Sequence, residues 1–277
     1  MYKKKNNFIR KIISRDYYLS LSVISIVIKN RIKLKKLGKY IDLNEINKSN
    51  DKYGVWQNTD NLNKFLGFRL TNIDLMQFLT SLIPKKIIYT EIGVSVLKNF
   101  FLMANFLNKS KLYAFDINKI YPPMKKYLIQ TSENKNIVEY SFKNNKIIYF
   151  QGDVFSQKDL ENFSNIFSKK TNFVYSDADH SKEGLLFEYE HFYKNMLDEE
   201  FILYFDDINS KTMPGFKAIF EKIKKEQTDK EISGYTFWIN GWMGKNENQH
   251  QNGIISTINI SKALKENRIK LKYFKIL

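Results

Sequence analysis

The chain has 277 residues, of which 43% are hydrophobic and 27% are charged, and it has no cysteine. This length suits one large domain or a domain with an extension, and the apolar content is sufficient for a globular core. Without cysteine the chain forms no disulfide and no thiolate metal site. Any bound metal must therefore use oxygen atoms or the three histidines, which favours a hard cation such as Mg²⁺.

The formal net charge of +16 is concentrated at the N-terminus. Residues 1–40 hold twelve Lys or Arg and one acid, Asp16, so this segment carries +11 and the rest of the chain only +5. We therefore expect no nucleic-acid partner for the body of the protein. The apolar run 17–28 is shorter than the ~20 residues of a spanning helix and has no cleavage site after it. It predicts a docking helix in a cytoplasmic protein, with peripheral attachment of residues 1–40 to a membrane or an acidic partner as the alternative.

A polar, turn-rich stretch at 44–63 predicts a domain boundary near residues 55–60. It divides the chain into a basic, mostly helical extension, 1–58, and a larger domain, 59–277. At the start of the larger domain, apolar residues at helical spacing predict a helix over 61–83, which ends before Pro84.

Apolar strands and amphipathic helices then alternate along the chain. Together with two strand-like runs near the C-terminus that have no helix between them, they predict an α/β protein. We expect a Rossmann-like, doubly wound sheet of seven strands, mostly parallel with an antiparallel C-terminal strand. The expected strands are 85–93, 111–118, 145–153, 172–179, 200–209, 235–239 and 253–260, and the expected helices are 96–107, 122–134, 157–168, 183–197 and 214–226.

Carboxylates stand at the end of each of the first five predicted strands. Ligands of an open α/β sheet bind beyond the carboxyl ends of the strands, so these side chains are expected to share one edge. Each alone is explained by helix capping or a turn, but five together indicate a cationic ligand with hydroxyl and amine donors. They are Glu91, Asp116, Asp153, Asp177 with Asp179, and Asp206 with Asp207.

The first of these strand ends lacks the glycines of a phosphate-binding loop. Gly93 is followed by Ser95 and Leu97, where a dinucleotide-binding loop would need glycine, and no G-x-x-x-x-G-K-[ST] occurs in the chain. A pyrophosphate would also be repelled by the row of carboxylates. The sequence therefore favours neither a dinucleotide nor a nucleoside triphosphate.

These motifs resemble the class I S-adenosylmethionine-dependent methyltransferases over roughly residues 60–277. The stretch EIG at 91–93 is similar to the first motif of that family. The resemblance implies S-adenosylmethionine as cofactor, with Asp116 on the ribose hydroxyls and Asp153 near the adenine amine. The full set of cofactor-binding residues it implies is Glu91, Gly93, Ser95, Asp116, Asp153, Val154, Asp177, Asp179 and His180.

The stretch SDADHSKEG followed by FDDIN resembles a narrower group, the metal-dependent O-methyltransferases. These include the catechol and caffeoyl-coenzyme A types and bacterial enzymes acting on sugars of glycosides and antibiotics. The resemblance implies Asp177, Asp206 and Asp207 as ligands of a divalent cation, most readily Mg²⁺. It also implies a catalytic set of Lys182 or His180 as base, with Asp179 on the methionine amine or completing the metal site. A metal that binds two vicinal oxygens lowers the pKa of a hydroxyl, and a nearby base then takes the proton.

We therefore expect a metal-assisted O-methyltransferase that acts on a hydroxyl of a sugar, a glycan or another polyhydroxylated small molecule. Tyr235, Trp238, Trp242 and the loop 241–253 are expected to line the acceptor pocket. Two alternatives stay open: a metal-independent methyltransferase of the same fold, and a non-catalytic scaffold that binds membrane or nucleic acid through the basic N-terminus. The acceptor and the formation of a homo-oligomer also stay open.

Overall fold

The computed structural model describes residues 19–37, 67–241 and 249–277. The predicted boundary near 55–60 therefore lies outside the described residues. Within the described ranges, no helix combines the length and the apolar character that crossing a membrane would require.

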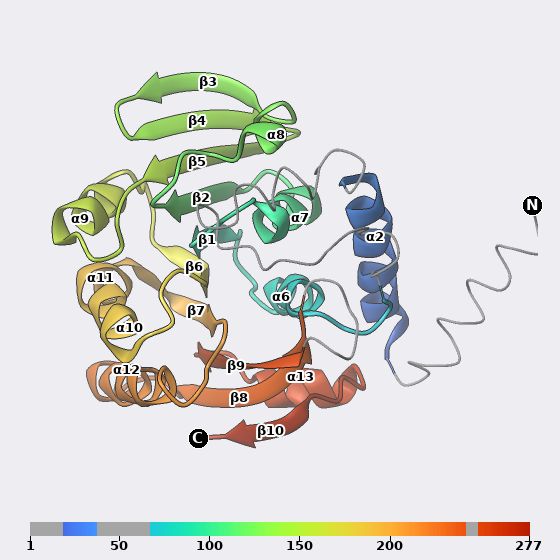
Figure 1. Ribbon diagram of the computed structural model, residues 1–277. Coiled ribbons are helices and arrows are strands. Elements are labelled where there is room, and N and C mark those ends of the chain that lie inside the picture. Colours follow the sequence, from blue (N-terminus) through green and yellow to red (C-terminus); the bar gives the residue numbers. More distant parts are fainter. Residues whose placement is uncertain (1–18, 38–66, 242–248) are drawn as a thin grey trace, which may run out of the picture.

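A single mixed sheet of ten strands runs through the molecule in the order β10-β8-β9-β7-β6-β1-β2-β5-β4-β3 (Figure 1). Its centre is parallel, because β1 pairs in parallel with β2 and β6, β2 with β5, and β6 with β7. The predicted α/β class and Rossmann-like fold are confirmed, whereas the predicted seven-stranded, mostly parallel sheet is wrong. The sheet has ten strands, and five of the nine pairs of neighbouring strands are antiparallel. The central strands are β1 (Ile88–Ile92), β2 (Lys111–Asp116), β5 (Asn145–Gln151), β6 (Thr171–Ser176) and β7 (Leu197–Phe205).

At the C-terminal edge the sheet becomes antiparallel, as expected. Strand β9 (Gln249–Ser256) lies between β7 and β8 (Ser233–Asn240) and is antiparallel to both. Helix α13 (Ile260–Glu266) and a further edge strand, β10 (Lys272–Ile276), follow. We did not expect β10, because its residues are largely exposed and show no apolar alternation.

The opposite edge overturns the predicted helix over 122–134. Only α8 (Pro122–Lys125) is helical there, and a hairpin of β3 (Ile129–Asn134) and β4 (Ile137–Phe142) follows and pairs with β5. Every residue of β3 is exposed, so the strand carries no alternation that the sequence could reveal. Its turn places Lys135 at a φ of +46° instead of using the Asn-Gly or Asp-Gly pair typical of hairpins.

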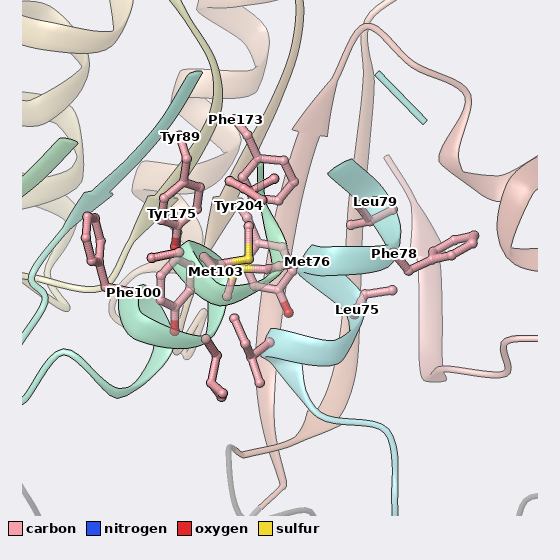
Figure 2. Close-up of a cluster of buried hydrophobic side chains, with 14 of the residues drawn as sticks. Leu75, Met76, Phe78, Leu79, Tyr89, Phe100, Met103, Phe173, Tyr175 and Tyr204 are labelled. Carbon is pink, nitrogen blue, oxygen red and sulfur yellow. The ribbon is translucent and has the colours of Figure 1, made fainter. Parts of the chain in front are cut away.

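Helices cover both faces of the sheet (Figure 1). Two apolar clusters result, one on each face of the sheet. In Figure 2, side chains of α6 and α7, such as Met76 and Met103, lie against Tyr89, Phe173 and Tyr204 of the sheet. One face carries α2 (Leu21–Leu37), α6 (Asn72–Thr80) and α7 (Lys98–Phe106), and the other carries α9 (Gln157–Asn165), α10 (Lys182–Glu188), the π-helical turn η1 (Tyr189–Tyr193), α11 (Lys194–Met196) and α12 (Met213–Glu226).

Helix α2, within the predicted extension, packs against α6 of the larger domain through a buried polar junction. The side chain of Arg31, 2% exposed, forms a 2.6 Å ion pair with the fully buried Asp74, and Asn30 donates to the same carboxylate at 2.8 Å. Asp74 also accepts from the backbone and hydroxyl of Thr71 in the capping box of α6. Arg31 is therefore neutralised inside the protein, and its charge does not contribute to a basic surface of the N-terminal segment.

Candidate functional site

The sheet has a switch point between β1 and β6. From β1 the chain continues to β2 on one side, whereas β6 lies on the other side, and ligands of open α/β sheets bind outside the carboxyl ends of the strands at such a point. The two loops touch there, because Asp177 N–H donates to the carbonyl of Ile92 at 2.8 Å. Gly93 has a φ of +84°, and a Cβ at this position would overlap the Asp177 carbonyl. Glycine is therefore required for the two loops to meet.

The loop after β1 adopts a glycine-like backbone without the usual glycines. Ser95 and Leu97 have φ values of +48° and +61°, which is the left-handed region that glycine enters most readily. Each non-glycine residue in this region costs roughly 1–2 kcal/mol. Leu97 is only 2% exposed, so burial of its side chain offsets this cost, and Ser95 N–H donates to Asp116 Oδ2 at 2.8 Å. The positions where the sequence lacks glycine thus keep the conformation that glycine would favour.

Two of the strand-end carboxylates, Glu91 and Asp116, are deeply buried. Glu91 is 1% exposed and accepts a 2.6 Å hydrogen bond from the Tyr89 hydroxyl, and burial raises the pKa of Glu91 to about 8. Asp116 is 7% exposed and accepts from the backbone N–H groups of Ser95 and Asn118, each at 2.8 Å. Burial also raises the pKa of Asp116. Burial thus disfavours the charged form of both carboxylates at the edge where a ligand would bind.

Asp177 and Asp206 face one another across the ends of β6 and β7. Burial, and next the charge of Asp206, raise the pKa of Asp177 well above its usual value. Asp177 accepts from the Tyr175 hydroxyl at 3.2 Å, and Asp206 accepts from the side-chain amide of Asn252 at 2.6 Å. Like charges so placed are stabilised by a bound cation, which makes this pair the centre of the candidate site.

Asp206 and Asp207 form a compact donor group with His250 of β9. One ligand atom from each of these residues lies within 4.8 Å of the others. His250 Nδ1 is 2.6 Å from Asp207 Oδ1 and 3.4 Å from Asp206 Oδ1. Its Nε2 is buried and has no hydrogen-bond partner among the described residues.

The charges of this group act on one another. The bond to His250 lowers the pKa of Asp207, and although burial alone would lower the pKa of His250, the two aspartates raise it. The sequence predicted His250 only as part of the acceptor loop 241–253 and not as a metal donor, because the pairing of β9 with β7 is what brings it beside Asp207.

The three residues predicted as catalytic are placed differently from one another. His180 is near the acidic pair, with Nε2 3.8 Å from Asp177 Oδ1. Asp179 instead accepts from the backbone N–H and the hydroxyl of Ser181, the N-cap residue of α10. Lys182 is exposed on the first turn of that helix. His180 thus lies beside the carboxylates, whereas Asp179 is hydrogen-bonded to the N-cap residue of α10.

Asp153 and Val154 lie in the turn before α9. The Asp153 carboxylate accepts from Phe155 N–H at 2.9 Å, and its own N–H donates to Asp159 Oδ2 at 3.0 Å. Val154 packs against the apolar cluster of the α9 face. Their predicted contact with adenine stays a prediction.

Lys98, at the start of α7, is a cation that sequence reasoning did not single out. Its charge lowers the pKa of both Glu91 and Asp177, so it lies within electrostatic reach of the acidic edge. The sequence feature that could have identified Lys98 is its position directly after the loop 93–97. Of the aromatic residues expected around the acceptor, Tyr235 is buried, Trp238 is 37% exposed, and Trp242 lies outside the described residues.

Comparison with known proteins gives structural similarity without sequence similarity. No family model matches the sequence, and no curated protein matches it either. Among solved structures, the O-methyltransferase TomG from Streptomyces achromogenes, in complex with SAM, is similar with a TM-score of 0.42 and 8% identity over 65% of this chain and 77% of that chain.

Two further structures are similar at the same level. The plantazolicin methyltransferase BamL has a TM-score of 0.44 and 13% identity over 85% of this chain and 98% of that chain. A candidate caffeoyl-CoA O-methyltransferase from Staphylococcus aureus has a TM-score of 0.41 and 16% identity over 82% of this chain and 98% of that chain. At these values the function has to be argued from the site itself.

Proposed function

We propose that this chain is an S-adenosylmethionine-dependent O-methyltransferase, assisted by a divalent cation, that acts on a hydroxyl of a sugar or another polyhydroxylated small molecule. The observation that supports the proposal is the convergence of carboxylates near the switch point, of which Glu91 and Asp116 are buried and Asp177 is partly exposed. Glu91, Asp116 and Asp177 all have raised pKa values there. Such a site favours a ligand that brings positive charge and hydrogen-bond donors.

S-adenosylmethionine supplies those features, since it carries a sulfonium, an ammonium group and a ribose diol. In the proposed complex the ribose hydroxyls donate to Asp116, and the ammonium group binds near Asp177. The ribose contact is the one that the resemblance implies. The ammonium is assigned to Asp177 in place of Asp179, because Asp179 accepts from Ser181 at the start of α10.

The residues present fit a divalent cation. Asp206 and Asp207 each use one carboxylate oxygen in the hydrogen bonds described above and keep a second oxygen for a metal. Asp177, beside Asp206, would provide a further oxygen. His250 either joins the donors through its ring nitrogen or orients Asp207 through their hydrogen bond. A bound cation would lower the pKa of the acceptor hydroxyl.

The transfer itself requires mainly positioning and a base. The sulfur–methyl bond breaks as an oxygen–methyl bond forms, S-adenosylhomocysteine leaves, and the hydroxyl proton passes to a base. We assign that role to His180, because its ring lies 3.8 Å from Asp177 at the acidic edge. Lys182, exposed and two residues further along the chain, is the second candidate for the base.

One observation favours a non-catalytic scaffold as the second candidate. Lys98 already lowers the pKa of Glu91 and of Asp177, so the chain itself supplies part of the counter-charge at the acidic edge. In a scaffold, this lysine would replace the cofactor's cation, and S-adenosylmethionine would not bind. In an enzyme, the cofactor binds despite Lys98.

The proposal is tested by incubating the full chain with methyl-labelled S-adenosylmethionine and a panel of sugars, sugar phosphates and catechols, with Mg²⁺ or with EDTA. Label transferred to a sugar hydroxyl only in the presence of metal would support it. Asp206→Asn should abolish the transfer, while Asp229→Asn, a matched change at an exposed position outside the site, should not. Transfer that is insensitive to EDTA and to Asp206→Asn would instead support the metal-independent enzyme.

A parallel titration with Mg²⁺ and with Zn²⁺ defines the donor set. Mg²⁺ prefers oxygen ligands, whereas an imidazole donor suits Zn²⁺. Equal Mg²⁺ affinity in wild type and His250→Gln would indicate that His250 only orients Asp207. A Zn²⁺ affinity that collapses in His250→Gln would make the imidazole a ligand.

A further inference from the structure

A small cavity of about 160 Å³ lies at the C-terminal end of the sheet, outside the acidic site. It is formed by the end of β8, the start of β9, the segment leading into α6 and the connection from α13 to β10. The side-chain amide of Asn240 ties two of these segments together, because it donates to the carbonyl of Leu70 at 2.9 Å. A backbone bridge between Thr71 and Asn240 reinforces the same junction. Two of the four segments that line the cavity are therefore fixed relative to one another.

The charge of this cavity is opposite to that of the acidic edge. Arg69, Arg268, Lys270 and Lys272 contribute to its wall. No acidic side chain lines it within the part of the chain that the structure describes. Arginine and lysine side chains bind phosphate through charge-assisted hydrogen bonds. A doubly charged phosphate balances the charge of these four cations better than a single carboxylate does.

An aromatic side chain borders the same cavity. Trp238 of β8 lines it and remains 37% exposed, and its ring meets that of Tyr273 at a centroid distance of 6.4 Å. Exposed tryptophan beside polar groups offers an apolar face to a ring of the ligand, such as a sugar or a base. The cavity thus combines cations with an aromatic surface.

The volume restricts what the cavity holds. Whole-ligand pockets measure roughly 300–1,000 Å³, and a water molecule occupies about 30 Å³ of liquid. A cavity of about 160 Å³ is too small for an entire cofactor or nucleotide sugar but has room for a phosphate group with part of its neighbouring ring.

The cavity is also close to the acidic edge. Ile239, which lines it, is the cross-strand partner of His250, the residue bonded to Asp207. Only β9 separates β8 from β7, so two strand spacings, or about 10 Å, span the distance between their ends. A ligand anchored in the cavity can therefore extend a neighbouring group toward the carboxylates.

From these observations we infer that the cationic cavity binds the phosphate of the acceptor, which makes the acceptor a phosphorylated polyol such as a sugar phosphate or a nucleoside diphosphate sugar. The phosphate sits among Arg69, Arg268, Lys270 and Lys272, and the hydroxyl to be methylated faces Asp206 and Asp207. This inference rests on the proposed function, because it specifies the substrate of that same site.

The test is a calorimetric titration of the full chain with inorganic pyrophosphate at low salt, in parallel with a titration with S-adenosylmethionine. Arg268→Asn with Lys272→Gln removes two charges from the cavity. Asparagine suits position 268, where φ is +56°, so the change adds no backbone strain. Lys262→Gln with Lys265→Gln removes two exposed charges from α13 outside the cavity and is the matched control.

We expect pyrophosphate to bind the wild type and the control equally, and to bind the cavity variant at least tenfold more weakly. Absence of pyrophosphate binding, or equal weakening in cavity variant and control, would overturn the inference and leave the proposed function standing if S-adenosylmethionine still binds. Pyrophosphate binding as expected, without binding of S-adenosylmethionine, would refute the proposed function and with it the assignment to an acceptor. Binding to phosphatidylglycerol vesicles but not to soluble pyrophosphate, lost in the same variant, would make a lipid head group the ligand and overturn the inference.

Discussion

Two aspartates of this molecule, the buried Asp74 and the partly exposed Asp177, differ in where their counter-charge comes from. Asp74, in the junction between α2 and α6, is paired with Arg31 and accepts further hydrogen bonds from Asn30 and Thr71. Asp177, at the switch point, accepts from the Tyr175 hydroxyl and faces Asp206, and its pKa is raised well above the usual value. A carboxylate that serves the fold is given its counter-charge by the chain. One that serves a ligand is left to obtain part of its counter-charge from outside.

The largest effect on stability should come from breaking the ion pair between Arg31 and Asp74. Arg31→Met removes the counter-charge of Asp74 and leaves a buried carboxylate unpaired, which typically costs 3–5 kcal/mol, a figure we take as roughly the loss expected here. Urea unfolding would measure this loss. Lys35→Met, an exposed change on the same helix, should stay within about 0.5 kcal/mol of wild type. Equal stability of Arg31→Met and wild type would mean that the junction does not hold α2 in place.

Glu91 should make the stability of the protein depend on pH. Its folded pKa is raised to about 8, above the value of about 4.3 expected when unfolded, so the folded state holds a proton that the unfolded state has lost between these values. The stability that this proton confers is fully present below about pH 4.3 and is lost as the pH rises through about 8.

The variant Glu91→Gln should remove this dependence and be more stable than wild type at pH 8 by up to about 5 kcal/mol, while matching it near pH 4.5. Unfolding in urea at several pH values would measure the difference. If wild type and variant fall in parallel as the pH rises, Glu91 does not hold the proton that its burial implies.

Replacing Asp177 should reduce cofactor binding without reducing stability. In Asp177→Asn the amide still accepts from the Tyr175 hydroxyl, and the repulsion from Asp206 is gone, so we expect stability unchanged or higher by about 1 kcal/mol. Affinity for S-adenosylmethionine should fall at least tenfold. Thermal unfolding and calorimetry on the same preparation measure both quantities, and a variant that is unstable but binds the cofactor normally would reverse our reading of Asp177.

The smallest effect concerns the backbone beside the same site. Ser95→Gly relieves the left-handed strain at φ +48°, and we expect a gain of up to about 1 kcal/mol. Ser95→Val places a β-branched residue in that region and should cost about 1–3 kcal/mol. Chemical denaturation of the pair gives the comparison, and a more stable valine variant would show that the loop is not held in this conformation.

The sequence predicted the centre of the fold because its strands are continuous apolar runs, such as residues 201–205 of β7, buried on both faces. It missed β3 and β10 because exposed edge strands show no hydrophobic pattern, and the turn at Lys135 has no glycine to mark it. Edge strands are defined by the neighbour they pair with, which a local pattern does not contain.

The candidate site divides in the same way. The strand-end carboxylates were predictable because the ends of parallel strands share one edge, whatever the details of packing. His250 was not, because an antiparallel strand 43 positions after Asp207 brings it there. The loop at 93–97 offers a third case: its composition lacks glycine, yet its backbone enters the left-handed region at Ser95 and Leu97. Residue type and backbone conformation are therefore separate observations, and only the structure supplied the second.

The central claim is that the acidic edge binds a cationic cofactor. It is tested most directly by calorimetric titration of the full chain with S-adenosylmethionine, with Asp116→Ala as the site variant and Asp229→Ala as the exposed control. We predict one site with micromolar affinity in wild type and control, and loss of binding in Asp116→Ala. No binding to the wild type, or equal binding to all three proteins, would contradict the account.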